Sequence, residues 1–277
     1  MTPTVTAHVI NVAGQTERMR HMQNSLAALG LPCERIAAVG LDDAAAFSGL
    51  PPDRIHLSPG ELACHCSHVR TWQVIAAGTD AWGLVLEDDV IFSADARAGI
   101  DAALAVGTAD LLRIEDGGLK KAVLSRKGTV AGETGFRLFD YTDGVVGSAA
   151  YLLSRDAAQR LVAQPSAYDR PLDRVLFNPA PRDLSVQMLW PAVAIQSDCI
   201  ARQTGRLGPQ WTQADLPVFG STLDHHEARH PKSLAKKIGA EWAHVSRATR
   251  FALTGRHRRT VPLSAAGPLR LSDAATP

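Results

Sequence analysis

Apolar and amphipathic stretches alternate along the first third of the chain in the order expected of a parallel α/β sheet. The apolar run at 5–12 predicts a buried strand, and the run at 33–39 predicts a second one. Between them, apolar residues recur at spacings of three and four from position 19 to 29, which indicates one face of a helix that ends near Gly30. A strand, a helix and a second strand in this order are how a parallel α/β sheet begins.

A capping signal marks the start of the next helix. The segment 58–61 (SPGE) places Ser at the N-cap, Pro at the first helical position and Glu at the third, which together form a capping box. The segment before it, 41–59, is looser and rich in Asp, Pro and Gly. We expect the helix to end at Ala77, because a glycine follows it.

Short apolar runs continue this pattern to about residue 200. We expect a central strand at 81–86 that resumes at 90–92, a helix at 94–106, a strand at 110–114, a loop or hairpin at 117–135, a strand at 145–153, a helix at 155–162, a Pro-punctuated loop at 165–181 and a strand within 186–196. The elements predict an α/β domain at 1–202 with a mixed, mainly parallel central sheet. An extension at 203–262 and a disordered tail at 263–277 are expected to follow it, since the tail is small and polar.

Composition adds little to this picture except for location. The 277 residues are 45% apolar and 21% charged, with a net charge of +1, which is ordinary for a soluble globular protein. The N-terminus lacks the basic start of a signal peptide, and no run approaches the roughly 18 apolar residues of a membrane span. A cytoplasmic location with free cysteine thiols is therefore expected. Cys64-His65-Cys66 with His68 could form a zinc site. Structural zinc sites favour paired knuckles, however, and the sequence has no second pair, so we expect small buried residues on a helix.

Positive charge gathers near the C-terminus. The stretch 229–259 holds nine Lys or Arg residues against the single acid Glu241, and apolar residues at helical spacing predict a basic amphipathic helix. This helix would either dock peripherally on anionic lipid at the inner face of a membrane or pack on the catalytic domain. Nucleic acid is not expected as a partner, because no basic motif interleaved with aromatic residues accompanies the charge.

An acidic cluster, Glu87-Asp88-Asp89, follows the strand expected at 81–86. Side chains two apart on a strand share a face, so Glu87 and Asp89 are expected to lie together where ligands of open α/β sheets bind. Two such carboxylates repel each other, and Mg²⁺ or Mn²⁺ would relieve the repulsion while binding phosphate oxygens. The alternative is a solvated turn between two strands.

Four segments occurring in order resemble glycosyltransferase family 25, which includes lipopolysaccharide and lipooligosaccharide core glycosyltransferases and is related to collagen galactosyltransferases. They are VINVAGQTERMRHM, SPGELACHCSHVRTW, WGLVLEDDVIF and GSAAYLLSRDAAQRLV. The resemblance implies a nucleotide-sugar-binding fold of the GT-A type and a metal, usually Mn²⁺. It also implies inverting transfer of a hexose, often galactose, from a UDP-sugar donor to a glycan or lipid-linked saccharide acceptor.

Matching positions then receive the family's roles. The metal is assigned to Asp89 first and Glu87 second, with Asp89 also counted as catalytic. The donor-site residues are expected to be Asn11, Arg18, Glu61, Ser67, His68, Glu87 and Asp88. Other positions that match the family are Cys64, Tyr151, Ser154, Pro191 and Gln196.

A general base must take the proton of the acceptor hydroxyl in an inverting transfer. Asp173, which matches a family Asp after a proline, is the first candidate, and Asp143 and Asp116 are runners-up.

Several donor-site assignments have structural alternatives, such as a solvated Arg18 and core packing for His68. Glu61 also completes a capping box, and Asp88 could instead bind a neighbouring backbone group.

Two departures from the family pattern concern donor recognition. Asn11 is followed by Val-Ala-Gly in place of Leu and a charged residue, and the loop at 38–40 lacks the family's Asp. They keep a second reading open, a catalytically inactive relative that binds a nucleotide sugar or glycan. A metal-dependent phosphoesterase is the third alternative, although two-metal hydrolases draw ligands from more strands.

Overall fold

A computed structural model describes residues 5–116, 121–144, 146–163, 170–177, 184–203, 207–211, 216–217, 219 and 255–271. The strands are β1 (Val5–Asn11), β2 (Cys33–Ala37), β3 (Trp82–Glu87), β4 (Val90–Phe92), β5 (Leu111–Arg113), β6 (Ala122–Ser125), β7 (Thr129–Val130), β8 (Arg137–Asp143), β9 (Ala150–Ser154), β10 (Val186–Trp190), β11 (Ala194–Gln196) and β12 (Arg256–Arg259). The helices are α1 (Thr16–Ala28), α2 (Ala44–Ser48), α3 (Pro59–Ala77), α4 (Ala96–Val106), α5 (Arg155–Ala163), α6 (Leu172–Phe177) and α7 (Ser197–Arg202), with short 3₁₀ turns at Pro52–Arg54 and Pro209–Trp211.

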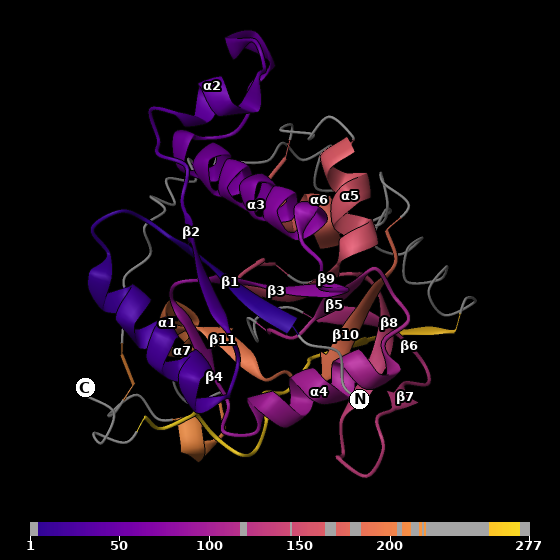
Figure 1. The fold of residues 1–277 in the computed structure, drawn as a ribbon. Helices are drawn as coiled ribbons and strands as arrows, with labels where there is room; N and C mark the ends of the chain where they lie inside the picture. The colour runs from indigo at the N-terminus through magenta and orange to yellow at the C-terminus, as the bar shows by residue number, and fades with distance from the viewer. Residues whose placement is uncertain are drawn as a thin grey trace, which may run out of the picture.

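The central sheet has ten strands in the order β12-β6-β8-β10-β5-β9-β3-β1-β2, with β7 paired to β8 (Figure 1). Strands β2, β1, β3, β5 and β10 run in one direction, and β9 is inserted antiparallel between β3 and β5. The predicted α/β class with a mixed, mainly parallel sheet is therefore confirmed. A separate two-stranded sheet pairs β4 with β11.

Helices cover both faces of this sheet, because its central strands are apolar on both sides. Along β3, Leu84 and Leu86 pack in one cluster with residues of α1 and α4, whereas Val85 packs in another with residues of α3, α5 and α6. The alternation follows the two-residue period of a strand. Figure 1 shows α3 and α5 on one side of the sheet and α1 and α4 on the other.

The two helices with the clearest sequence signals form as predicted. Helix α3 begins with the capping box, in which Ser58 Oγ accepts a hydrogen bond from Glu61 N and Glu61 Oε2 accepts one from Ser58 N, at 3.3 and 2.9 Å. The helix ends at Ala77, as expected. Helix α1 buries the apolar stripe that its spacing predicts.

Several elements differ from the expectation. Helix α2 forms inside the loose segment 41–59, and α6 forms inside the loop expected at 165–181. Strand β8 occupies a stretch for which the pattern predicts no element. The single strand expected within 186–196 is two strands, β10 and β11, because Pro191 has no N–H with which to continue a ladder.

The C-terminal residues return to the sheet. Strand β12 pairs antiparallel with β6, so the end of the basic stretch, beyond the segment predicted to be helical, is a strand. Pro268 bridges to Ser93, and Leu269 N donates to Phe92 O at 2.7 Å. The expectation of a disordered tail from 263 is therefore wrong for 263–271, whereas 272–277 and the predicted basic helix at 232–253 lie outside the described residues.

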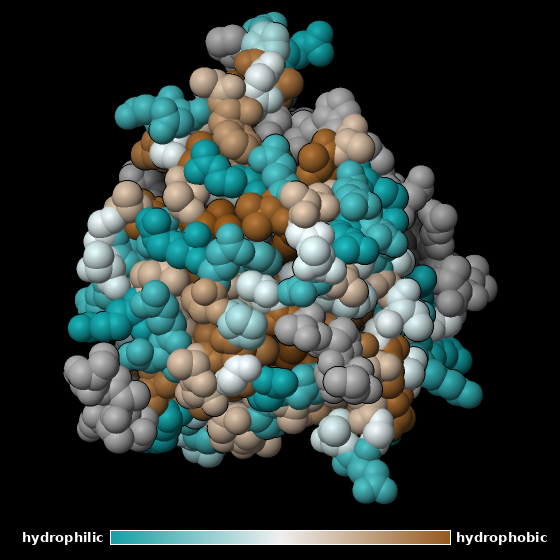
Figure 2. Space-filling model, viewed as in Figure 1, coloured by the Kyte–Doolittle hydropathy of each residue, from teal (hydrophilic) through white to brown (hydrophobic). Residues whose placement is uncertain are grey.

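The surface mixes polar and apolar residues. Large hydrophobic side chains that are exposed among the described residues are Val12, Leu41, Val130 and Val162. Figure 2 shows hydrophobic residues in separate small areas between polar ones on the face in view. Among the described residues, none of the helices has the length and apolar character that a membrane crossing requires.

Candidate active site

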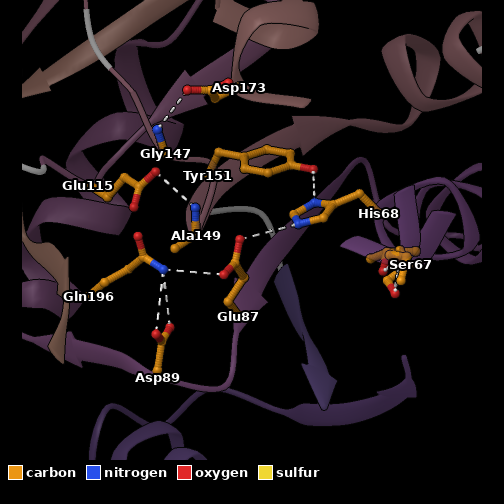
Figure 3. A network of polar contacts seen from close by, with 12 residues as sticks. Ser67, His68, Glu87, Asp89, Glu115, Gly147, Ala149, Tyr151, Asp173 and Gln196 are labelled. Atoms are coloured by element: carbon orange, nitrogen blue, oxygen red, sulfur yellow. Dashed lines mark hydrogen bonds and ion pairs between the residues drawn. The ribbon is translucent and has the colours of Figure 1, made fainter. Parts of the chain in front are cut away.

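Polar side chains meet at the carboxyl ends of the parallel strands, where α/β proteins bind their ligands. Strand β3 ends at Glu87, and a two-residue turn of Asp88 and Asp89 leads into β4. Strand β11 brings in Gln196 by pairing it with Val90. Figure 3 shows Glu87, Asp89 and Gln196 within a continuous set of polar contacts that extends to His68 and Tyr151.

One amide group connects two carboxylates of the acidic cluster. The Gln196 Nε2 atom donates to Glu87 Oε2 at 3.3 Å and to the two carboxylate oxygens of Asp89 at 3.4 and 3.5 Å. The side chains of Glu87 and Asp89 therefore point toward the same place, as their spacing on the strand predicts. Asp89 is 5% exposed, so this negative charge is largely removed from water.

Burial disfavours ionisation of both carboxylates. It raises the pKa of Glu87 to about 7, and the charge of Asp88 adds to this effect. It raises the pKa of Asp89 to about 7 as well, with repulsion from Glu87 and then Asp88 as further causes. A positive charge between Glu87 and Asp89 would remove the repulsion and favour the ionised forms.

Asp88 belongs to a different set of contacts. Its two oxygens accept hydrogen bonds from Asn11 Nδ2 at 2.7 Å and from Arg18 Nη1 at 3.1 Å. Arg35 Nε in turn donates to Asn11 Oδ1 at 2.8 Å. The structure thus brings together three predicted donor-site residues, Asn11, Arg18 and Asp88, beside the Glu87 and Asp89 pair.

His68 faces the cluster from the middle of α3. Its Nδ1 lies 2.9 Å from the Tyr151 hydroxyl oxygen, and that oxygen accepts a hydrogen bond from Trp72 Nε1 at 2.8 Å. Its Nε2 lies 3.6 Å from Glu87 Oε1. Burial lowers the pKa of His68 to about 3, so the ring is neutral at physiological pH.

Cys64 lies one helical turn before His68. Ligand atoms of Cys64, His68 and Glu87 all lie within 4.8 Å of one another. The zinc alternative that included Cys66 does not form as a cluster, because the Cys66 thiol contacts the carbonyl oxygen of Ala44 at 3.5 Å.

A buried ion pair organises the loop beside the cluster. Arg113 at the end of β5 pairs with Glu115 at 3.0 Å, donates to Val146 O at 2.8 Å and donates to Gly147 O. Glu115 Oε1 accepts from Ala149 N at 2.9 Å. Sequence reasoning missed this pair, although an arginine within an otherwise apolar strand is a signal that could have indicated it.

Asp173, the predicted base, lies in the first turn of α6 next to the same loop. Its Oδ2 accepts a hydrogen bond from Gly147 N at 3.2 Å, and its charge contributes to raising the pKa values of Glu87 and Cys64. The runner-up Asp143 instead accepts from Gly144 N at 2.7 Å, at the end of β8. The other runner-up, Asp116, is buried after β5.

Two predicted donor-site residues have structural contacts of their own. Glu61 uses its carboxylate in the capping box. Ser67 Oγ donates to Ala63 O at 2.7 Å and accepts from Val39 N at 2.9 Å, which connects α3 to the loop after β2. Figure 3 shows Ser67 apart from the contacts between Glu87, Gln196 and Asp89.

The fold and this cluster define an α/β protein whose site lies at the strand ends of a mixed sheet. The chain belongs to glycosyltransferase family 25, because the family model described as "Glycosyltransferase family 25 (LPS biosynthesis protein)" matches residues 4–176, more than half of its length. The protein is therefore a glycosyltransferase.

Comparison with solved structures gives distant resemblances. The inositol-1-phosphate CTP transferase of T. maritima is 9% identical with a TM-score of 0.35, and the match covers 68% of this chain and 67% of that one. A protein described as mannose-1-phosphate geranyltransferase from Thermus thermophilus is 13% identical with a TM-score of 0.36, covering 70% and 75%. No curated protein matches the sequence significantly.

Proposed function

We propose that this glycosyltransferase moves a hexose, with galactose as the first candidate, from a UDP-sugar to a glycan acceptor of the lipopolysaccharide type. The proposed reaction is metal-assisted and inverts the anomeric centre. The observation that carries the proposal is the pair of Glu87, which is partly buried, and Asp89, which is buried, with both carboxylates directed at one amide group. Membership of family 25 supports the class of acceptor.

The residues present fit a divalent cation. Glu87 and Asp89 supply carboxylate oxygens, which are the donors that Mn²⁺ and Mg²⁺ prefer. Desolvation, with repulsion from neighbouring carboxylates, raises the pKa of each to about 7. A cation bound here would neutralise charge on the diphosphate leaving group.

The donor nucleotide is proposed to lie beside the Asn11, Arg18 and Asp88 set. Arg18 is buried next to Asp88, and its guanidinium group suits a diphosphate oxygen. Asp88 holds Arg18 and Asn11 in place through one carboxylate. Glu61, Ser67 and His68 stay predictions as donor contacts, and the first two already have the structural contacts described above.

Asp173 is proposed as the general base. The acceptor hydroxyl oxygen forms a bond to the anomeric carbon on the face opposite UDP, the bond from that carbon to the UDP oxygen breaks, and the hydroxyl proton passes to the Asp173 carboxylate. The hydrogen bond from Gly147 N fixes one oxygen of that carboxylate and leaves the other for the proton.

The proposed class of acceptor suggests where the protein would act in the cell. A lipid-linked saccharide would be met at the inner face of a membrane, and peripheral contact through the basic stretch 229–259 is part of the proposal. Residues 229–254 of that stretch lie outside the described residues, so the sequence alone supports this point.

The experiment is incubation of the purified protein with a panel of UDP-hexoses and a lipopolysaccharide-type acceptor, with Mn²⁺ and with excess chelator. We expect UDP release that depends on both acceptor and metal, with one hexose preferred. Donor binding without turnover would instead identify an inactive relative. Phosphate release from simple esters would identify a phosphoesterase.

A further inference from the structure

We propose that Cys64, His68 and Glu87 form a second cation site, which takes a borderline divalent ion of the Zn²⁺ or Co²⁺ class. The site would lie on the α3 side of Glu87, whereas the site proposed for Mn²⁺ or Mg²⁺ lies on the Asp89 side. It does not depend on sugar transfer, so the two proposals can fail separately.

Helix geometry places two of the ligands together. Cys64 and His68 are four residues apart on α3, so their side chains lie on the same face, one turn apart. Strand β3 ends opposite this face and supplies Glu87. The thiol, imidazole and carboxylate atoms lie within 4.8 Å of one another. Binding would draw them slightly inward, since an ion with bonds of about 2.0–2.3 Å holds its ligands closer together.

The histidine is oriented as a metal ligand would be. His68 is completely buried, and its Nδ1 is held by the Tyr151 hydroxyl, which Trp72 Nε1 fixes in turn. A ligating imidazole usually donates its other ring N–H to an acceptor, so His68 would bind an ion through Nε2 with the ring proton on Nδ1, donated to this hydroxyl. The Nε2 atom is buried without a hydrogen bond and points toward Glu87, as Figure 3 shows.

The two oxygens of Glu87 face different groups. Oε1 lies 3.6 Å from His68 Nε2, and Oε2 accepts from Gln196 Nε2 at 3.3 Å. Gln196 donates its other hydrogen bonds to Asp89, on the side of Glu87 away from Cys64. Glu87 can therefore serve one cation with each oxygen, which is why we infer two sites that share a residue.

The ligand types define the class of ion. One sulfur, one nitrogen and one oxygen suit Zn²⁺ or Co²⁺, whereas Mg²⁺ prefers oxygen alone. Three protein ligands leave a fourth position open, as in zinc sites that also bind a small molecule. Cys64 is only partly buried, so the ion has a route to the site.

Cobalt spectroscopy tests the site directly. Co²⁺ added to the purified full-length protein should give a near-ultraviolet thiolate-to-metal band that saturates at one ion per chain. Cys64→Ser should abolish the band, and Cys66→Ser, its neighbour on the same helix, should keep it. Tyr151→Phe should keep the band but weaken Co²⁺ affinity roughly tenfold or more, because it removes the group that orients His68.

Asp89→Asn separates this proposal from the proposed function. It should keep the cobalt band while losing metal-dependent UDP release. Absence of the band in the wild-type protein, its survival in a folded Cys64→Ser or Cys64→Ala variant, or its loss in Asp89→Asn would each overturn the second site. In that case the contact between His68 and Glu87 is structural only. Circular dichroism of each variant establishes that it is folded.

Discussion

At the scale of single residues, Glu87 connects the parts of the site. One of its oxygens faces His68, and the other faces the amide of Gln196 and thus Asp89. Asp88, between the two acids in sequence, points to Asn11 and Arg18 instead. Asp88 therefore points away from the acids on either side of it, because neighbouring side chains at a strand end point in different directions.

The role of Asp173 as base is tested by Asp173→Asn. We expect kcat to fall by roughly 10²–10⁴-fold, the usual contribution of general acid–base catalysis, with donor affinity unchanged. Asp143→Asn is the matched control. Asp143 accepts a hydrogen bond from the N–H of Gly144 at the end of β8, so its substitution should leave kcat unchanged. Near-normal turnover in Asp173→Asn would remove this residue from the mechanism.

Glu115 should make stability depend on pH. Burial raises its pKa from 4.5 to about 7, so the folded chain holds a proton here that the unfolded chain releases above about pH 4.5. Its stabilising contribution is complete below that pH and is lost as the pH rises through about 7. The free energy of unfolding of the wild type, minus that of Glu115→Gln, should fall by about 3 kcal/mol across this window.

Urea unfolding at several pH values measures this difference. Glu115→Gln keeps an oxygen that can accept from Ala149 N, so the loop contact is preserved in the control. A difference that is flat with pH, or that rises from pH 5 to 8, would contradict a raised pKa for Glu115.

At the scale of elements, the capping box of α3 allows the structural role of Glu61 to be tested separately from a role in donor binding. Ser58→Ala and Glu61→Ala should each lower the free energy of unfolding by about 1 kcal/mol, as loss of an N-cap does. Gln15→Ala is the control, since Gln15 makes no side-chain cap at α1. If Glu61 also binds the donor, only Glu61→Ala will raise the KM for UDP-sugar. Equal KM values in the two variants would leave Glu61 a structural role alone.

The elements that could be predicted carry their signal locally. The start of helix α3 is marked by the capping residues Ser58 and Glu61. Strand β3 is a short apolar run that ends in polar residues. Strand β8 could not be predicted because its buried and exposed residues do not alternate regularly and it depends on its neighbours β6 and β10. Helix α6 is only six residues long and lies within a proline-rich stretch.

The site could be predicted in part for the same reason. The acidic cluster is contiguous in sequence, so its spacing alone places Glu87 and Asp89 on one face. Gln196 is 107 residues from Asp89, and its contact arises only when β11 pairs with β4. Arg113 stands out in an otherwise apolar strand and signals a buried ion pair, but its spacing from Glu115 does not show that the pair also holds the loop at 146–149.

At the scale of the whole molecule, the C-terminal residues complete the catalytic domain. Strand β12 extends the sheet, and 263–271 pack near β4. The division expected between 1–202 and a separate extension therefore does not describe residues 255–271. Removing the chain from 229 onward would also remove these contacts, so charge neutralisation tests the basic stretch better than truncation does.

Membrane docking predicts that anionic vesicles bind the protein at low salt. Changing Lys232, Lys236 and Lys237 to Gln should weaken this binding roughly a hundredfold, given about 1 kcal/mol for each basic residue near the surface. The same change at Arg20, Arg54 and Arg137, which are exposed and lie outside this stretch, is the control. Vesicle flotation measures both variants. Wild-type protein that stays unbound, or an equal loss in the control, would exclude docking through this stretch.

The central claim is that the acidic cluster holds the cation that assists transfer, and Asp89→Asn tests it most directly. UDP release should be measured for wild type and variant, with Mn²⁺ and with excess chelator. We predict chelator-sensitive turnover in the wild type and a loss of roughly 10²–10³-fold in the variant, the scale of removing one electrostatic stabiliser. Metal-dependent transfer that persists in Asp89→Asn at the wild-type rate would contradict the account.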